Sequence, residues 1–275
     1  MRTRTPKVFI TGAAGELGLP LGNMLVAAGW DVSGCDLRPA PGAGFPISLC
    51  DLTQCPPEGV DWSGYEAVVH LANHSDDQRA TPARLLAENA AMNHNVFGGA
   101  IAAGVRTLVF ASTMQVFRGP FSAELGDVEY LPLDGRLAFR YSATNSYAES
   151  KRNAEDALRT LARQHPERAF VVLRLPRVCL LPRHIPRPSA GPRNHPERGE
   201  GYSYLLVDEL ARLVLAILRA RLTGFRCYFP AARDNSLGLP ATTVIRRHYA
   251  SVPLRAPLAA IDALVDTSEI TRDTG

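Results

Sequence analysis

A glycine-rich stretch near the N-terminus decides the fold of this chain: Thr11-Gly12-Ala13-Ala14-Gly15-Glu16-Leu17-Gly18. It follows the apolar segment Val8-Phe9-Ile10, which predicts a buried strand, and it leads into a segment with helical spacing of apolar residues. The acidic residue Asp36 closes the next predicted strand, eighteen positions after Gly18. A glycine-rich strand-to-helix turn followed by an acid at this distance is the fingerprint of a dinucleotide-binding site.

Each part of this fingerprint has a physical role. Gly12 permits the tight turn, Gly15 lets the backbone approach a pyrophosphate, and Gly18 lets the helix pack close to the sheet. The helix N-terminus offers unpaired N–H groups and the positive end of its dipole to the phosphates. The Asp36 carboxylate accepts hydrogen bonds from a ribose 2′-hydroxyl and repels a 2′-phosphate, so the sequence favours NAD over NADP. Arg38, two residues further on, is the feature that could hold a phosphate instead.

The bulk composition is that of an ordinary globular protein. The 275 residues are 46% hydrophobic and 21% charged, and they suffice for one large domain or two coupled domains. The formal net charge of +3 is too small to predict a nucleic-acid partner. No apolar run reaches the roughly 18 residues that a membrane helix needs. The basic N-terminus has no separate apolar signal segment, so a cytoplasmic location is expected.

The five cysteines predict neither a disulfide framework nor a metal site. Their number is odd, and the pair Cys50 and Cys55 has no second pair or histidine partner nearby. Structural thiols are therefore expected rather than zinc ligands. His184 and His195 are too isolated in the sequence to indicate a metal.

Short apolar strands alternate with amphipathic helices through roughly the first 230 residues. The predicted strands are 7–11, 31–36, 47–49, 67–71, 107–111 and 170–174, and the predicted helices are 16–28, 83–103, 147–164 and 208–221. This order predicts an α/β fold, namely a doubly wound parallel sheet of the Rossmann type with helices on both faces. Pro20 lies just beyond the first turn of the first predicted helix, where it is expected to distort the backbone.

Two regions interrupt this alternation. The segment 183–201 is rich in proline, arginine and glycine and predicts neither helix nor strand, and its role stays open. The tail after Ala231 has short mixed signals, and its polar end, 266–275, is expected to be frayed. We expect a dinucleotide-binding domain made of residues 1–175 and 205–231, and a small, partly interleaved substrate-binding cap made of residues 176–204 and 232–275.

Tyr147 and Lys151 lie four positions apart at the start of a predicted helix, so they share one face of it. A free phenol has a pKa of about 10 and is a poor base at neutral pH. A neighbouring ammonium and a cationic nicotinamide would lower the pKa of Tyr147, which could then exchange a proton with a substrate hydroxyl during hydride transfer. The alternative is a surface tyrosine and lysine on an amphipathic helix.

Two hydroxyl groups, those of Ser112 and Thr113, follow the predicted strand 107–111. Ligands bind at the carboxyl ends of strands in open α/β sheets. We therefore expect Thr113, supported by Ser112, to hold the reacting oxygen beside Tyr147. The alternative is a capping or turn hydroxyl.

Several short motifs occur in order along the chain. Besides the glycine stretch and Asp36, they are Cys50-Asp51-Leu52, His70-Leu71-Ala72, Asn95-Val96-Phe97-Gly98, Val109-Phe110-Ala111-Ser112-Thr113, Tyr147 with Lys151, and Leu173-Arg174. Over roughly residues 6–230, this ordered set resembles the extended short-chain dehydrogenase/reductases of the NAD-dependent epimerase/dehydratase type. The resemblance implies an NAD cofactor and an enzyme that acts on sugars, which are often nucleotide-activated.

The resemblance also implies roles for single residues. Thr113, Tyr147 and Lys151 match the family's catalytic set, and Asp208 matches a structural acid that opens a late helix. The implied cofactor-binding residues are Gly12, Ala14, Gly15, Glu16, Leu17, Asp36, Asp51, Leu52, Leu71, Ala72, Ala111, Tyr147 and Lys151. The implied substrate-binding residues are Asn73, Thr113, Met114 and Arg177, and no metal ligand is implied.

The sequence departs from the family pattern in three places. Sugar 4,6-dehydratases carry an Asp-Glu pair after the catalytic threonine, whereas this chain has Met114-Gln115, which disfavours dehydration. Arg177 stands where nucleotide-sugar epimerases commonly have a substrate-contacting asparagine. The short chain and small expected cap resemble the uronate dehydrogenases of the family, which oxidise a free sugar acid.

Polar residues near the expected site leave alternatives open. The basic residues of the expected cap are Arg177, Arg183, Arg187, Arg193 and Arg198. One or two of them could clamp a carboxylate or a diphosphate, or the segment could be a solvated loop. His74, Asp76 and Asp77 follow a predicted strand and are expected to be polar loop residues.

The sequence thus predicts an NAD-dependent oxidoreductase that acts on a secondary alcohol of a sugar or sugar derivative, as a nucleotide-sugar epimerase or a sugar or uronate dehydrogenase. Its expected partner is a small-molecule substrate, without nucleic acid or membrane, and the resemblance implies a homodimer through the helices near 83–103 and 147–164. One alternative is a dehydrogenase or isomerase of an apolar, steroid-like alcohol, whose pocket should be mainly apolar. The other is a non-catalytic dinucleotide-binding sensor, which has no need of the Tyr147 and Lys151 pair.

Overall fold

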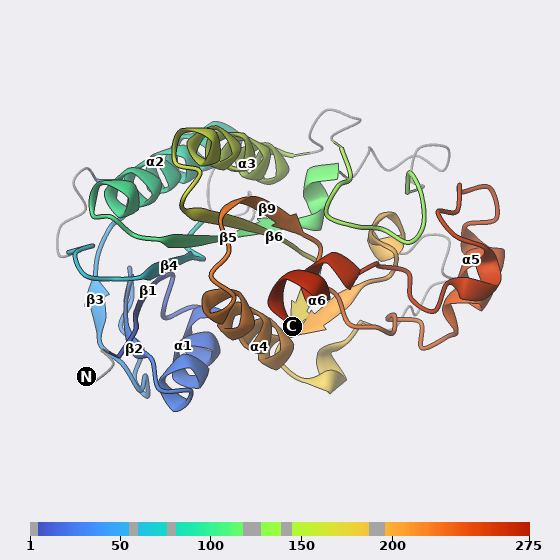
Figure 1. The fold of residues 1–275 in the computed structure, drawn as a ribbon, viewed down its shortest axis with the longest axis horizontal. Helices are drawn as coiled ribbons and strands as arrows, with labels where there is room; N and C mark the ends of the chain where they lie inside the picture. Colours follow the sequence, from blue (N-terminus) through green and yellow to red (C-terminus); the bar gives the residue numbers. More distant parts are fainter. Residues whose placement is uncertain (1–4, 55–59, 76–80, 118–127, 139–144, 187–195) are drawn as a thin grey trace.

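A seven-stranded parallel sheet forms the centre of the computed structural model, which describes residues 5–54, 60–75, 81–117, 128–138, 145–186 and 196–275. The strand order is β3-β2-β1-β4-β5-β6-β9, and every pairing is parallel. The strands are β1 Lys7–Thr11, β2 Asp31–Asp36, β3 Ile47–Leu49, β4 Ala67–His70, β5 Thr107–Thr113, β6 Ala169–Leu175 and β9 Gly224–Tyr228. The predicted doubly wound α/β fold is confirmed (Figure 1).

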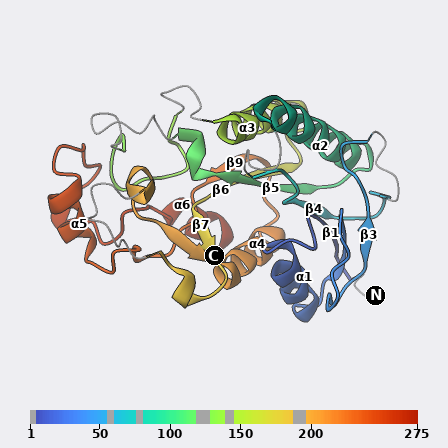
Figure 2. The same ribbon diagram turned by 180° about the vertical axis from the view of Figure 1, so that it is seen from behind.

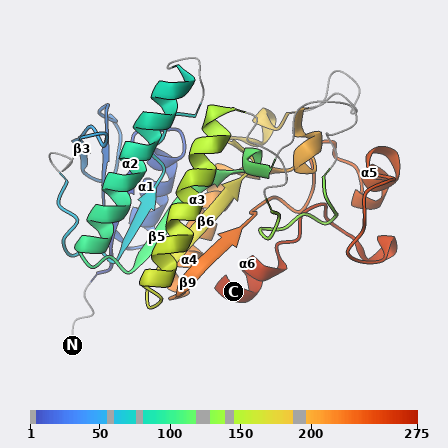
Figure 3. The ribbon, with the colours of Figure 1, turned by 90° about the horizontal axis from the view of Figure 1, so that it is seen from above.

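Helices cover both faces of this sheet (Figures 1 and 3). The helices α2 (Pro82–Ala102) and α3 (Ser146–Gln164) lie side by side on one face. The other face carries α1 (Gly18–Ala27), α4 (Val207–Arg219) and α6 (Ser268–Thr274). Side chains of β1 alternate between the two layers: Val8 and Ile10 pack on the α1 side and Phe9 on the α2 side. Because both faces are covered, the strand reads as a continuous apolar run.

The first turns of two helices follow from local chemistry. Asn145 precedes α3, and its side-chain oxygen accepts a hydrogen bond from the Ala148 N–H at 2.7 Å. The helix α1 begins at Gly18, two residues later than predicted, so Pro20 lies within its first turn. Backbone N–H groups in a first turn have no partner inside the helix, so the missing N–H of Pro20 costs no helical hydrogen bond. The predicted distortion at Pro20 is therefore wrong.

Some regular elements of the described residues were not predicted from the sequence. The strand β9 extends the central sheet beyond β6. Two short strands, β7 (Arg177–Cys179) and β8 (Tyr204–Leu206), pair in parallel as a separate sheet. The helix α5 (Ala241–His248) lies at the end of the molecule remote from β3 (Figures 1 and 2). None of the described helices combines the length and the apolar character required to span a bilayer.

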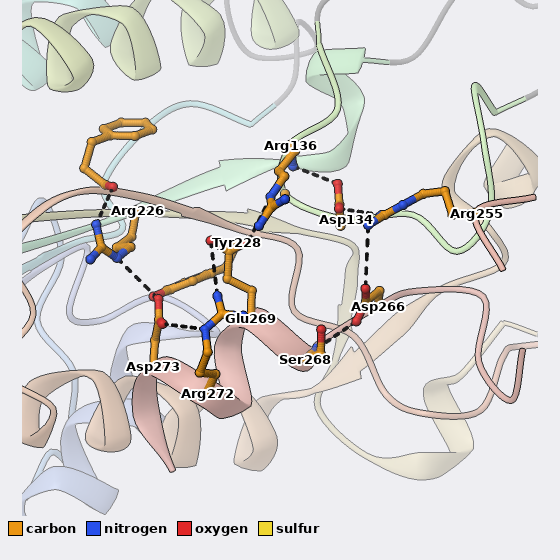
Figure 4. A network of polar contacts seen from close by, with 12 residues as sticks. Asp134, Arg136, Arg226, Tyr228, Arg255, Asp266, Ser268, Glu269, Arg272 and Asp273 are labelled. Carbon is orange, nitrogen blue, oxygen red and sulfur yellow. Dashed lines mark hydrogen bonds and ion pairs between the residues drawn. The ribbon is translucent and has the colours of Figure 1, made fainter. Parts of the chain in front are cut away.

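The C-terminal tail is held against the sheet by polar contacts (Figure 4). The Tyr228 hydroxyl donates to Asp273 Oδ2 at 2.6 Å, and the Arg226 guanidinium lies 3.3 Å from the same oxygen. Ile270 packs into the apolar layer that contains α1 and α4. These contacts between distant segments stabilise α6, so the prediction that this tail is frayed is wrong.

Besides the two apolar layers on the faces of the sheet, a third hydrophobic cluster lies at the carboxyl end of strand β5. Met114, directly after β5, belongs to it together with residues of α5 and of the segment before α3. Isolated bridges join Leu131 to Leu254 and Leu133 to Val265. The C-terminal region is thereby packed against the chain just ahead of α3, close to the edge where the carboxyl ends of the strands emerge.

Candidate active site

The carboxyl ends of three neighbouring strands bring the predicted residues together. The strands β1, β4 and β5 are adjacent and parallel, so the segments that follow them emerge at the same edge of the sheet. The glycine stretch follows β1, Leu71-Ala72-Asn73 follows β4, and Thr113 ends β5. Tyr147 and Lys151 reach this edge from the first turns of α3.

The glycine stretch is packed too tightly for side chains at two positions. Gly12 has a φ of +70°, and a Cβ on it would lie 2.9 Å from the Ala72 backbone nitrogen. A Cβ on Gly18 would lie 2.2 Å from the Gly12 carbonyl oxygen. The loop therefore stays close to the start of α1, where N–H groups without a helical partner are available. This cradle fits the pyrophosphate of a dinucleotide.

Asp36, at the end of β2, lies beside the glycine stretch. Its Oδ2 accepts a hydrogen bond from the Ala14 N–H at 3.0 Å, and its Oδ1 accepts one from the Arg38 N–H at 3.2 Å. The carboxylate is half-buried and retains acceptor capacity for ribose hydroxyls, since two oxygens provide about four lone-pair sites.

The Asp51-Leu52 pair lies in a loop that side chains hold in place. Asp51 Oδ1 accepts hydrogen bonds from the Thr53 N–H at 2.9 Å and the Thr53 hydroxyl at 2.7 Å, which lower the pKa of Asp51. Asn95 of α2 donates through Nδ2 to the carbonyl oxygens of Leu52 at 2.9 Å and Gln54 at 2.7 Å. Asn95 therefore holds in place the loop that carries Asp51 and Leu52, two of the cofactor-binding residues implied by the resemblance.

Lys151 is buried at the centre of the predicted catalytic set, with 3% of its surface exposed. Its Nζ donates to the Ala111 carbonyl oxygen at 2.6 Å and to Asn73 Oδ1 at 2.9 Å. The same Nζ lies 5.6 Å from the centroid of the Tyr147 ring. The Thr113 side chain lies near enough to the Tyr147 phenol to lower its pKa. The structure thus brings Thr113, Tyr147 and Lys151 together at the end of β5.

Burial is the largest influence on the pKa values of Tyr147 and Lys151. It raises the pKa of Tyr147 to about 12; the Glu200 carboxylate adds to this rise and the Thr113 hydrogen bond opposes it. Burial lowers the pKa of Lys151 to about 7, against the attraction of the Glu155 carboxylate. The sequence predicts that the ammonium and a bound nicotinamide lower the pKa of Tyr147; the surrounding protein acts in the opposite direction, because burial and the Glu200 carboxylate outweigh the contribution of Thr113. The sequence also did not single out Glu200, which is buried after β7.

A buried ion pair that the sequence did not predict lies behind the site. Arg174 Nη2 is 2.8 Å from Glu155 Oε2, and both side chains are at most 2% exposed. The Ser112 hydroxyl donates to Glu155 Oε1 at 2.5 Å, and Arg174 Nη1 donates to the Leu137 carbonyl oxygen at 2.6 Å. Two signals were available: an arginine in an apolar buried strand, and an acid one helical turn after Lys151.

Other predicted residues lie in different environments. Met114 is 1% exposed within the third hydrophobic cluster, whereas Arg177 is exposed in β7. His74 Nε2 lies 2.7 Å from a Glu88 carboxylate oxygen, which agrees with a polar loop residue. The residues Cys55, Asp76, Asp77, Arg187, Arg193 and His195 lie outside the described part of the chain.

A cleft of about 620 Å³ lies away from this edge, among α3, β9 and α6. The charged residues that line it are Arg136, Asp156, Arg159, Arg174, Arg226, Glu269, Arg272 and Asp273. Thr113, Tyr147 and Lys151 are not among its lining residues, so this cleft is separate from the candidate site.

Several solved structures share the fold. UDP-glucose 4-epimerase from Bifidobacterium longum in complex with NAD+ and UDP is 18% identical, with 98% of this chain and 92% of that chain covered and a TM-score of 0.67. TunA, an NAD-dependent NDP-hexosamine 5,6-dehydratase of tunicamycin biosynthesis, is 21% identical, with 98% and 91% covered and a TM-score of 0.66. MoeE5 in complex with UDP-glucuronic acid and NAD is 19% identical, with 98% and 92% covered and a TM-score of 0.65.

The family assignment comes from a protein-family model. At these identities, the solved structures show a common fold and no more, and no curated protein matches the chain. The model of the NAD dependent epimerase/dehydratase family matches residues 8–189, about two-thirds of the chain. The predicted family and the predicted cofactor, NAD, are confirmed at this level. The chain belongs to the NAD dependent epimerase/dehydratase family.

Proposed function

We propose that this protein is an NAD-dependent oxidoreductase that transfers a hydride at a secondary alcohol of a sugar or sugar derivative. The observation that carries the proposal is the cluster of Thr113, Tyr147 and Lys151 beside the glycine stretch. Structures with the same fold hold NAD together with UDP or with UDP-glucuronic acid, which supports a sugar or nucleotide-sugar substrate.

NAD, when bound, accepts a hydride from the substrate carbon and can return it. Backbone N–H groups around the glycine stretch would hold its pyrophosphate, and Asp36 would hold the adenosine ribose. The residues proposed to complete this site are Gly12, Ala14, Gly15, Glu16, Leu17, Asp51, Leu52, Leu71, Ala72 and Ala111, with Tyr147 and Lys151 at the nicotinamide end.

Proton transfer falls to Tyr147 in this proposal. As phenolate it removes the proton of the substrate hydroxyl, and the neighbouring Thr113 hydroxyl orients the same oxygen. Burial raises the pKa of Tyr147, so forming the phenolate requires nearby positive charge. Lys151, 5.6 Å from the ring centroid, supplies one such charge in its protonated form. An epimerase and a dehydrogenase share this step and differ in whether the reduced cofactor leaves.

The test of the proposed function combines cofactor retention with a substrate panel. Purified protein is denatured and assayed for released NAD, and native protein is offered aldoses, uronic acids and nucleotide sugars. Freely exchanging cofactor with net NADH production identifies a dehydrogenase. Retained NAD and conversion of a nucleotide sugar without net NADH identify an epimerase. Absence of turnover on every sugar, with NAD bound, would overturn the substrate assignment.

Asp36→Ala is expected to weaken NAD binding about tenfold or more and to narrow the preference for NAD over NADP. The substitution removes a charged acceptor for ribose hydroxyls, and such hydrogen bonds contribute about 1.5–3 kcal/mol. It also removes the charge that repels a 2′-phosphate. Calorimetric titration with both cofactors measures the two effects.

Control variants distinguish the effect of the Asp36 charge on cofactor binding from the effect of its hydrogen bond to the Ala14 N–H. Asp36→Asn keeps a side-chain acceptor for the Ala14 N–H but loses the charge, so it should still relax the discrimination. Asp31→Ala removes a surface carboxylate that pairs with Lys7 and should leave both affinities unchanged. Equal titrations for wild type and Asp36→Ala would remove the ribose assignment.

We also propose a homodimer formed through α2 and α3. These helices pack side by side on one face of the sheet, and the exposed positions of α2 include the small residues Ala83, Ala87, Ala90 and Gly98 together with Arg84 and His94. Ala90→Arg is expected to give a monomer in sedimentation velocity, because a long charged side chain would enter that contact. Ala27→Arg on α1 serves as the control, and an Ala90→Arg protein that stays dimeric would exclude this face.

A further inference from the structure

The Lys151 amine is held by a neutral side chain that comes from a different strand end. Asn73, in the loop after β4, accepts a hydrogen bond from Lys151 Nζ at 2.9 Å through Oδ1. Its Nδ2 donates to Asn93 Oδ1 of α2 at 3.1 Å. If the amide were turned round, its nitrogen would face the amine and its oxygen would face Asn93 Oδ1. The contacts on both sides therefore fix the orientation of the Asn73 oxygen toward Lys151.

Asn73 is itself the end of a longer buried chain of hydrogen bonds. His70 Nε2 lies 2.9 Å from Asn93 Oδ1, and His70 Nδ1 lies 2.7 Å from the Thr11 hydroxyl oxygen. Burial lowers the pKa of His70 to about 3, so the ring is neutral at physiological pH. Because Asn93 Oδ1 only accepts, Nε2 carries the ring hydrogen and Nδ1 accepts from Thr11. The Ala72 N–H in turn donates to Thr11 Oγ1 at 3.3 Å.

We propose that Asn73 is a positioning residue for Lys151, holding its amine in the charged form and in one orientation, and not a substrate contact. The inference rests on the role proposed above for Lys151. The chain from Thr11 to Asn73 is 6% exposed or less at Thr11, His70 and Asn93, so it forms a rigid support for the Asn73 amide. It also ties the amine to Ala72, the residue against which Gly12 packs.

The groups around Lys151 show how Asn73 contributes to keeping the amine protonated. On its own helix the amine faces Tyr147 and the Glu155 carboxylate, which attracts it but is already paired with Arg174. From β4 it faces the neutral His70 ring. Burial favours loss of the Lys151 proton, and the Asn73 and Ala111 oxygens oppose that loss by each accepting one of the amine's hydrogens; Asn73 is the side chain of the two and can be substituted.

The composition of the chain makes the test direct, because it contains only two lysines, Lys7 and Lys151. Protein grown with lysine carrying ¹³C at the ε-carbon therefore gives two side-chain signals, which Lys7→Arg assigns. The chemical shift of each signal is followed against pH. The Lys7 side chain is 40% exposed and pairs with Asp31, so its signal serves as an internal reference.

Asn73→Asp places a carboxylate beside the amine and is expected to raise the Lys151 pKa by about one to three units. Asn73→Ala removes an acceptor and is expected to lower it, so the two variants shift the titration in opposite directions. Once a substrate is known, the high-pH limit of turnover should move in the same two directions. Asn153→Asp and Asn153→Ala, at an exposed position of α3, should shift neither lysine.

The NMR titration needs no substrate, so its outcome is independent of whether the proposed reaction is correct. If the Lys151 pKa is the same in wild type and in Asn73→Asp, the inference is wrong. So would a shift in the same direction in both Asn73 variants overturn it, because that is the result expected of a general structural disturbance. If Asn73→Ala does not fold, the near-isosteric Asn73→Asp decides alone.

Discussion

Tyr147→Phe is expected to lower turnover by about 10²- to 10⁴-fold, the range that a positioned proton-transfer group contributes. The substitution removes the phenolic oxygen, which lies close to Thr113 and is the proposed base. The ring beside Lys151 is kept, and Asp36 and Asp51 are untouched. NAD binding should therefore remain as in wild type. Steady-state rates on the identified substrate and calorimetric NAD titration measure the two properties.

Two further variants show whether the loss of turnover is specific to the Tyr147 hydroxyl. Tyr65→Phe removes a hydroxyl from another half-buried tyrosine, whose ring packs edge-on against Phe9 at a centroid distance of 5.3 Å, and should leave turnover unchanged. Thr113→Ala should lower turnover less than Tyr147→Phe, because Thr113 orients the oxygen without carrying the proton. A Tyr147→Phe protein that turns over at the wild-type rate would refute the assigned base.

Glu155→Ala is expected to lower the free energy of unfolding by about 3–5 kcal/mol, because it leaves the Arg174 charge buried without its partner. The pair is at most 2% exposed, and it joins α3 to β6 and, through Ser112, to the end of β5. A loss of this size is a large part of the roughly 5–15 kcal/mol that stabilises a typical domain. Urea denaturation followed by circular dichroism measures it.

A double substitution tests whether the loss comes from the uncompensated charge. Glu155→Leu combined with Arg174→Met removes both charges and should recover much of the stability, as apolar replacements of buried pairs often do. Glu167→Gln, which breaks an exposed pair with Arg168, should leave the unfolding transition nearly unchanged. A Glu155→Ala protein as stable as wild type would show that the buried pair does not stabilise the fold.

The centre of the sheet could be predicted from sequence because β1, β4, β5 and β6 are mainly apolar and buried on both faces. The predicted bounds of β1, β2 and β3 agree with the structure, and the glycine stretch is specified by local sterics at Gly12 and Gly18. The edge strand β9 and helix α6 were missed because neither carries a strong local pattern. Contacts such as Tyr228 with Asp273, 45 positions apart, are what stabilise them.

In the candidate site, too, features with a local sequence pattern could be predicted, and features that depend on distant contacts could not. The spacing of Tyr147 and Lys151 on one helix face predicted their proximity, since four positions span about one turn. The contact between Lys151 and Asn73 joins residues 78 positions apart, and no local pattern indicates it. The direction of the Tyr147 pKa also required the structure, because the degree of burial decides it.

A crystal structure of the protein with NAD tests the proposed site most directly. We expect the pyrophosphate against the loop at Gly12 and Gly15, the adenosine ribose on Asp36, and the nicotinamide end beside Tyr147 and Lys151. A well-ordered NAD molecule bound elsewhere, or bound with its nicotinamide away from these two side chains, would contradict the proposed site.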